Sequence, residues 1–277
     1  MGRRRITLVG AVLVAVVVVV AALAPVLAPW DPLALDVKSR LQGPAPDHWF
    51  GTDDVGRDVL SRVLYGARIS VIVGGLVVVL SVAAGLGVGL AAGYYRRLDG
   101  VLMRVMDGLM AFPAIILAIA LMASLGPSLR NVVLALGIVY TPRIARIVRG
   151  SVLVVRELPY VEAAHALGAS DIGIIGRHVL PNCLSPVIVQ STFIFALAVL
   201  GEAALSFLGV GVPPFVPSWG NILAEGRLYI QQAPWLTLFP GTGIMATILG
   251  LNLFGDGLRD LLDPKLRGLS GGARSAS

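Results

Sequence analysis

The side chains that could carry chemistry are few, and they do not form a catalytic pattern. Three histidines, His48, His165 and His178, stand far apart in the 277-residue chain, and Cys183 is the single cysteine. One cysteine excludes an intramolecular disulfide and a Cys-x-x-Cys pair. The sequence contains neither Gly-x-Ser-x-Gly nor His-Glu-x-x-His, the patterns of serine hydrolases and zinc peptidases. We therefore predict that the chain is not an enzyme.

The sequence also lacks Gly-x-x-x-x-Gly-Lys-[Ser/Thr], the loop that cradles nucleotide phosphates. Lys38 and Lys265 are its only lysines, and neither follows a glycine-rich turn. We predict that the chain binds no cofactor and hydrolyses no nucleotide itself. Energy for work across a membrane would then come from an ion gradient or from another subunit.

Three aspartates lie close together in the stretch FGTDDVGRDVL, namely Asp53, Asp54 and Asp58. Clustered carboxylates can hold a metal ion, but this spacing does not match the Asp-x-[Asp/Asn]-x-[Asp/Asn]-Gly loop of an EF-hand. Arg57 and Arg62 follow nearby. We expect helix capping and ion pairs in this stretch, and no metal site.

A second polar stretch, EAAHALGASDIGIIGRHVLPN (162–182), favours two short helices. Pro159 suits the first position of a helix, and Gly168 suits the position just past its end. Ser170 is a good N-cap for the second helix, which we expect Pro181 to stop.

The elements that position these residues are membrane helices. The chain is 56% hydrophobic and 14% charged, with a mean hydropathy of +0.85, values that indicate an all-α integral membrane protein. Apolar runs of the length needed to cross a bilayer predict six transmembrane helices. These runs cover residues 6–28, 69–95, 105–125, 131–148, 183–208 and 235–254.

A cleaved signal peptide is the alternative interpretation of the first run. Ala22 and Ala24 resemble a cleavage site, but Pro25 would follow the cut, and the run exceeds the usual apolar region of a signal peptide. We therefore expect an uncleaved first span.

Helix packing is predicted within the second run. Gly85, Gly89 and Gly93 recur every four residues and place bare backbone on one helix face, which permits close contact between helices in lipid. The arginines after this run predict a short loop, and Pro113 is expected to kink the third span. Those arginines are Arg96, Arg97 and Arg104.

The net charge of +6 is distributed as membrane orientation requires. The arginines flank apolar runs and do not alternate with aromatic residues, so we expect contact with lipid and not with nucleic acid. An N-terminus in the cytoplasm puts 15 of the 22 basic residues on that side and 7 opposite. Both termini and residues 162–182 are therefore predicted to be cytoplasmic, and the aspartate-rich stretch extracytoplasmic.

One carboxylate, Glu202, falls inside a predicted span near its outer end. An intramembrane carboxylate suggests function, such as a gate, but a hydrogen-bonded helix end at a subunit contact fits as well, and both interpretations stay open. A gradient-driven carrier would need several ionisable residues in its spans and often two repeated halves.

The stretch 162–182 resembles the EAA loop of ATP-binding-cassette (ABC) importer permeases. His178 stands where that pattern has isoleucine. The stretches 50–70 (FGTDDVGRDVLSRVLYGARIS), 202–214 (EAALSFLGVGVPP) and 251–267 (LNLFGDGLRDLLDPKLR) resemble the dipeptide/oligopeptide (peptide/nickel) branch, in its second-permease or "C" subunit type. The residues that fit the spacing of the loop are Glu162, Ala163, Ala164, Gly168, Leu180 and Pro181.

This resemblance implies a type I importer permease fold and a position in the bacterial cytoplasmic membrane. It implies four kinds of partner: a homologous permease, two cytoplasmic ATPases that bind ATP and Mg²⁺, an extracytoplasmic substrate-binding protein, and membrane lipid. The loop would dock on an ATPase, with Glu162 paired to a basic residue there. The expected coupling residues are Glu162, Ala163, Ala164, Leu167, Gly168, Ala169, Leu180 and Pro181.

The implied organisation has three parts. Residues 1–66 form the first helix with an extracytoplasmic segment, residues 67–258 a five-helix core containing the loop at 150–182, and residues 259–277 a cytoplasmic tail. The implied cargo is a di- or oligopeptide, with nickel or glutathione as alternatives and a stand-alone carrier as the rival class. The sequence assigns no residue to substrate binding.

Overall fold

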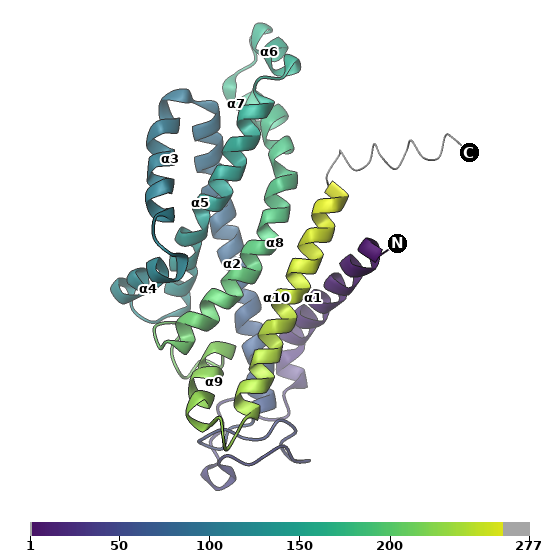
Figure 1. Cartoon of the computed structure of the whole chain (residues 1–277), viewed down its shortest axis with the longest axis vertical. Helices are drawn as coiled ribbons and strands as arrows, with labels where there is room; N and C mark the ends of the chain where they lie inside the picture. Colours follow the sequence, from purple (N-terminus) through teal and green to yellow (C-terminus); the bar gives the residue numbers. More distant parts are fainter. Residues whose placement is uncertain (1, 263–277) are drawn as a thin grey trace, which may run out of the picture.

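The computed structural model describes residues 2–262, in which an elongated helical bundle extends between two groups of loops (Figure 1). Five helices in this part of the chain are long and apolar enough to cross a membrane, and a bent pair makes six if it counts as one span. The long helices are α1 (Gly2–Leu27), α2 (Val59–Tyr94), α5 (Leu129–Val155), α8 (Leu180–Phe207) and α10 (Trp235–Leu262).

The centre of the bundle is the contact between α2 and α5, which the glycine repeat makes close. A Cβ atom on Gly85 would lie 2.5 Å from the Cβ of Ile144, and one on Gly89 would lie 2.6 Å from the Cβ of Val148. Gly93 lies in the same way against Val152 of α5. The spacing of four residues thus puts three bare backbone patches on the face that α5 covers.

The predicted third span does bend at Pro113, but as a sharp break between two helices and not as a kink within one. Two helices, α3 (Arg96–Met110) and α4 (Ala114–Leu125), meet at 92°. Pro113 has no backbone N–H and stands at the N-cap of α4, so the chain ends one helix and starts another. The arginines predicted to form a loop, Arg96, Arg97 and Arg104, instead lie in α3.

Helix α3 is attached to α5 by two ion pairs. Arg149 Nη2 donates to Asp99 Oδ2 at 2.7 Å, and Arg146 Nη2 donates to Asp107 Oδ1 at 2.6 Å. The second pair is about half exposed. An exposed pair contributes little stability, so it serves mainly to fix the register of the two helices.

Pro181 does not stop the helix that Ser170 starts, which corrects a second prediction. A short helix α7 (Asp171–Ile174) continues through a π-turn at Ile175–Val179 directly into α8. Proline removes one helical hydrogen bond and crowds the preceding turn. The wider π-turn lies just before Pro181, and the Leu180 N–H donates to the Ile175 carbonyl across it.

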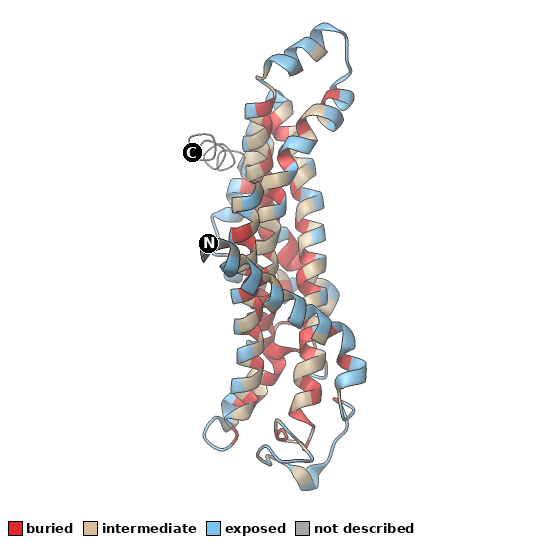
Figure 2. Cartoon of the chain, turned by 90° about the vertical axis from the view of Figure 1, so that its right-hand side faces the viewer, coloured by how far each residue is buried: buried red, intermediate tan, exposed pale blue. Residues whose placement is uncertain are grey.

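Helix α1 lies at the edge of the bundle and packs along α10 (Figure 1). Only 11% of its most apolar window is buried, and most of its surface is exposed (Figure 2). A Cβ on Gly10 would lie 2.5 Å from the backbone nitrogen of Phe254, which shows how closely the two helices approach. The exposed valines of α1 fit a lipid environment.

The loops opposite the 162–182 end form a compact cap (Figure 1). Residues 28–58 contain a short 3₁₀ turn at Val37–Ser39 and an isolated β-bridge between Thr52 and Asp58. They lie against the start of α10 and reach α9 (Trp219–Gly226) through the bond from Arg57 to Glu225. Phe50 stacks on Phe239 with ring centroids 3.8 Å apart. Helix α10 runs to Leu262, so the first residues of the predicted tail are helical, and the rest lies outside the described residues.

Candidate functional site

The predicted coupling loop forms the far tip of the bundle (Figure 1). Helix α6 (Pro159–Ala166) starts with proline at its first position and ends before Gly168, whose φ of +81° is a conformation that favours glycine. The Gly168 N–H donates to the His165 carbonyl at 2.9 Å, and the Ala169 N–H donates to the Ala164 carbonyl at 3.0 Å. These bonds close the first short helix and turn the chain toward α7.

The surface of this tip is apolar where it is most exposed. Leu167 is 87% exposed and Ile172 is 82% exposed, on either side of the turn. Glu162 is exposed on α6, while Val161 and Ile174 are buried beneath. Two large exposed apolar side chains on a loop with its own buried anchors are typical of a surface that contacts another protein.

Hydrogen bonds fix the tip to the end of α2. The Tyr94 hydroxyl lies 3.1 Å from His165 Nε2 and donates to Asp171 Oδ1 at 3.1 Å. Arg156, at the end of α5, donates to the Gly93 carbonyl at 2.8 Å. The tip is therefore bonded directly to α2 through Tyr94, and α2 is in turn bonded to the end of α5 through Arg156.

The structure does not bring all the expected coupling residues together. The first six occupy α6 and the turn after it, whereas Leu180 and Pro181 lie beyond the π-turn at the start of α8. Leu180 is half-buried and Pro181 is exposed. Tyr94 takes part in the tip and was missed, because it lies at the end of another helix and no spacing rule connects it to the loop.

The opposite end contains an ion-pair cluster. Arg57 Nε donates to Asp53 Oδ2 at 2.6 Å, and the buried Arg62 also pairs with Asp53. Asp58 caps α2 by accepting from the Ser61 N–H at 2.7 Å. The predicted capping and ion pairing are thus confirmed.

A distant residue completes this cluster. Glu225, on α9, accepts from Arg57 Nη2 at 2.9 Å and from Arg62 Nη2 at 3.0 Å. One carboxylate oxygen of Glu225 lies within 4.8 Å of a carboxylate oxygen of Asp53 and of Asp54. Burial, and then the neighbouring carboxylates, raise the pKa of Asp54. The two arginines supply positive charge here, and no sequence spacing could have indicated Glu225, which lies far along the chain.

Glu202 is fully enclosed by this chain's own residues. Its Oε1 accepts from the Ser206 hydroxyl at 2.8 Å, whereas Oε2 has no hydrogen-bond partner within residues 2–262. The hydroxyl of Ser70 on α2 is likewise buried and has no hydrogen-bond partner among the described residues. In this conformation the carboxyl group is buried within its own chain, and its one hydrogen bond to the described part of the chain is to Ser206 on the same helix.

Comparison with known protein families assigns the chain to a family of membrane transport proteins. Residues 83–268 match the family of binding-protein-dependent transport system inner membrane components, and residues 2–44 match the N-terminal transmembrane domain of oligopeptide transport permease C. The chain belongs to the first of these families, and it is a multi-pass protein of the inner membrane. The family works with a substrate-binding protein and an ATPase as partners.

Named relatives are similar along nearly the whole chain. A putative peptide transport system permease protein of Brucella suis is 55% identical over 96% of this chain and 90% of its own length. A dipeptide transport system permease protein of Alkalihalophilus pseudofirmus is 46% identical over 96% of this chain and 88% of its own length. A glutathione transport system permease protein of Pectobacterium atrosepticum is 41% identical over 96% of this chain and 89% of its own length.

Two solved structures confirm the type I importer permease fold. A methionine ABC transporter aligns with a TM-score of 0.56 and 18% identity, over 74% of this chain and 96% of the other. An amino acid ABC transporter aligns with a TM-score of 0.52 and 17% identity, over 76% of this chain and 94% of the other. At this identity the similarity concerns the fold alone.

Proposed function

We propose that this chain is one permease subunit of an ATP-driven importer of di- or oligopeptides. The relatives named as peptide and dipeptide permeases support the cargo, since they match this chain over nearly its whole length. A homologous permease would complete the membrane channel, two ATPases would bind ATP and Mg²⁺, and a binding protein would deliver the peptide. Residues 67–258 would form the moving core.

The exposed tip of α6 and the following turn supports the coupling role. Its apolar residues Leu167 and Ile172 are exposed, while Tyr94 bonds the tip to α2 and Arg156 bonds the end of α5 to α2. A docked ATPase could therefore move both helices by moving the tip. ATP and the loaded binding protein must each bind one of the two conformations, inward-facing or outward-facing, more tightly than the other. A ligand with equal affinity for both would not shift the equilibrium between them.

Glutathione import is the second candidate. A permease named for glutathione transport is 41% identical to this chain, and glutathione is itself a small peptide. Uptake of labelled Ala-Ala and of labelled glutathione by the complete transporter in proteoliposomes, each with and without ATP, separates the two. Uptake without ATP or partner subunits would instead support a stand-alone carrier.

Substitution of Glu162 by alanine tests the coupling role. Glu162 is exposed, so Glu162→Ala should leave assembly intact while it removes the carboxylate that would pair with the ATPase. We expect peptide uptake and the ATPase activity stimulated by loaded binding protein to fall together. Loss of one charge-assisted hydrogen bond, worth about 1.5 to 3 kcal/mol, predicts a roughly tenfold or larger decrease.

Glu157→Ala is the matched control, since Glu157 is an exposed carboxylate in the same cytoplasmic region and pairs with its neighbour Arg156. It should leave both activities unchanged. Wild-type uptake and stimulation in Glu162→Ala would show that this residue does not couple the subunits.

A further inference from the structure

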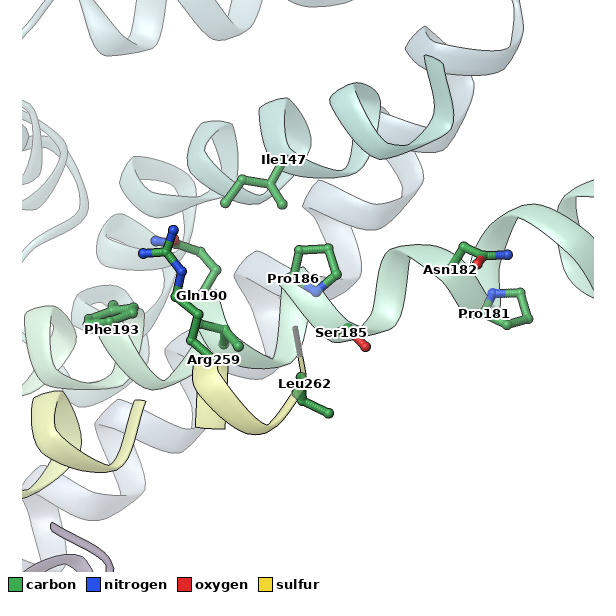
Figure 3. A pocket seen from close by; sticks show the side chains of 10 residues that line it. Ile147, Pro181, Asn182, Ser185, Pro186, Gln190, Phe193, Arg259 and Leu262 are labelled. Carbon is green, nitrogen blue, oxygen red and sulfur yellow. The ribbon is translucent and has the colours of Figure 1, made fainter. Parts of the chain in front are cut away.

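Two cavities that share lining residues lie beside α8. The larger, of about 610 Å³, lies between α8, α5 and the end of α10, with Ile147, Gln190 and Arg259 among its lining residues (Figure 3). The second, of about 310 Å³, contains Arg143 and Asn252. Both are lined by Gln190 and Phe193. The two neighbouring cavities are together named here the α5–α8–α10 groove, and each has a volume in the range of small-molecule sites.

The groove opens toward the end of the bundle that holds the coupling loop. Asn182, near the start of α8, and Leu262, at the end of α10, line its outer part (Figure 3). Ala196, Leu197 and Leu200 line its inner part, about two turns farther along α8 than Gln190. The groove therefore extends from the cytoplasmic end into the membrane-spanning part of the bundle.

Arg143 is the unusual residue of this groove. It lies in the membrane-spanning helix α5, half-buried, with its guanidinium 5.7 Å from the centre of the Tyr140 ring. Within the described part of the chain, no carboxylate pairs with it. The following arginines of this region each have a carboxylate partner, namely Arg146 with Asp107, Arg149 with Asp99, and Arg156 with Glu157.

An arginine without counter-charge inside a span is costly, and such residues usually serve a substrate or ion pathway. The described residues that line the groove include Arg143 and Arg259 but no acidic side chain. Arg259 also lines a neighbouring cavity together with Asp256 and Asp260, so Arg143 is the residue whose charge favours an anion in the groove. Gln190 and Asn252 add amide groups that can both donate to and accept from a peptide backbone.

We propose that the α5–α8–α10 groove is a peptide-binding part of the translocation path, in which Arg143 binds the C-terminal carboxylate of the peptide. A guanidinium can hold a carboxylate through two parallel hydrogen bonds. Gln190 and Asn252 bind the peptide backbone, and Phe193 contacts an apolar side chain. This assignment rests on the proposed peptide import.

Thiol labelling tests whether the groove holds water. Cys183, which is buried, is replaced by alanine, and single cysteines are introduced as Gln190→Cys in the groove and Val79→Cys on the exposed face of α2. The complete transporter in nanodiscs is treated with a charged methanethiosulfonate reagent. Gln190→Cys should react and Val79→Cys should not. An unreactive thiol at position 190 would overturn the proposal.

Protection by peptide tests recognition without the binding protein. Ala-Ala should slow labelling of Gln190→Cys, and Ala-Ala amide, which lacks the carboxylate, should do so much less. Adding Arg143→Gln should raise the Ala-Ala concentration for half protection roughly tenfold, the ratio that about 1.4 kcal/mol gives. Arg143→Lys should keep part of the protection.

Arg146→Gln is the control, because Arg146 is a neighbouring arginine paired with Asp107 outside the groove. It should leave protection by Ala-Ala unchanged. Equal protection by Ala-Ala and its amide, or unchanged protection in Arg143→Gln, would overturn the role of Arg143. ATP-driven Ala-Ala uptake by the wild-type transporter is measured separately, so a failure of peptide import itself is recognised independently.

Discussion

At the scale of single residues, buried charge decides where this chain is vulnerable. Arg62 is almost completely buried, and it neutralises Asp53, which is also buried, together with Glu225 of α9. A buried carboxylate that loses its partner keeps the cost of leaving water and loses the attraction that offset it. Removal of one member of the cluster should therefore cost more stability than removal of one member of the ion pairs between α3 and α5.

Arg62→Met should strongly destabilise the protein, by about 3 to 5 kcal/mol, because it leaves buried carboxylate charge with one remaining partner, Arg57. The melting temperature of the purified transporter measures this effect. Arg68→Met, an exposed arginine on the same helix, is the control and should have a small effect. Similar melting temperatures for the two variants would show that the cluster is not structurally important.

At the scale of helices, small residues determine how closely the bundle packs. Gly89→Val should destabilise the protein, because its side chain would be pushed into the Ala145 carbonyl and Val148 of α5. Overpacking should lower the free energy of unfolding by about 1 to 3 kcal/mol and the melting temperature by roughly 2 to 12 °C. Gly87→Val is the matched control, since nothing lies within 4 Å of that position. An equal decrease in both variants would contradict this role of Gly89.

Much of the helix arrangement could be predicted, since span lengths and the glycine spacing depend on local sequence. The 92° break at Pro113 could not, because proline permits either a kink or a break, and the packing of α3 on α5 selects between them. The π-turn before Pro181 has no sequence signal of its own. The loop residues of α6 were found by their spacing, whereas Tyr94 and Arg143 required the positions of neighbouring helices.

At the scale of the whole molecule, α2 connects the two ends. It is one uninterrupted helix of 36 residues, about 54 Å long. Its first turn carries Arg62 in the extracytoplasmic cluster, and its last residue, Tyr94, holds the coupling tip. A rigid helix fixed at both ends can transmit movement of the tip to the opposite face.

Tyr94→Phe should weaken this connection without disturbing the fold, since it removes only the hydroxyl that bonds to His165 and Asp171. We expect more ATP to be consumed per peptide imported, while the melting temperature changes by little, as a partly exposed hydrogen bond contributes about 0.5 to 1.5 kcal/mol. Tyr95→Phe is the control. An unchanged ratio of ATP to peptide in Tyr94→Phe would exclude this role of the hydroxyl.

The packing of α1 on α10 affects how the chain is made. The ribosome releases α1 first and α10 last, so at about 5 to 20 residues per second the first helix waits roughly 10 to 40 seconds for its neighbour. During that time α1 can contact only lipid and the helices made before α10, such as α2, on which it also packs. The mean hydropathy of the most apolar window of α1 is 3.1, and a segment this apolar is stable in the bilayer without α10 beside it. Completion of the bundle therefore depends on the last helix to be inserted.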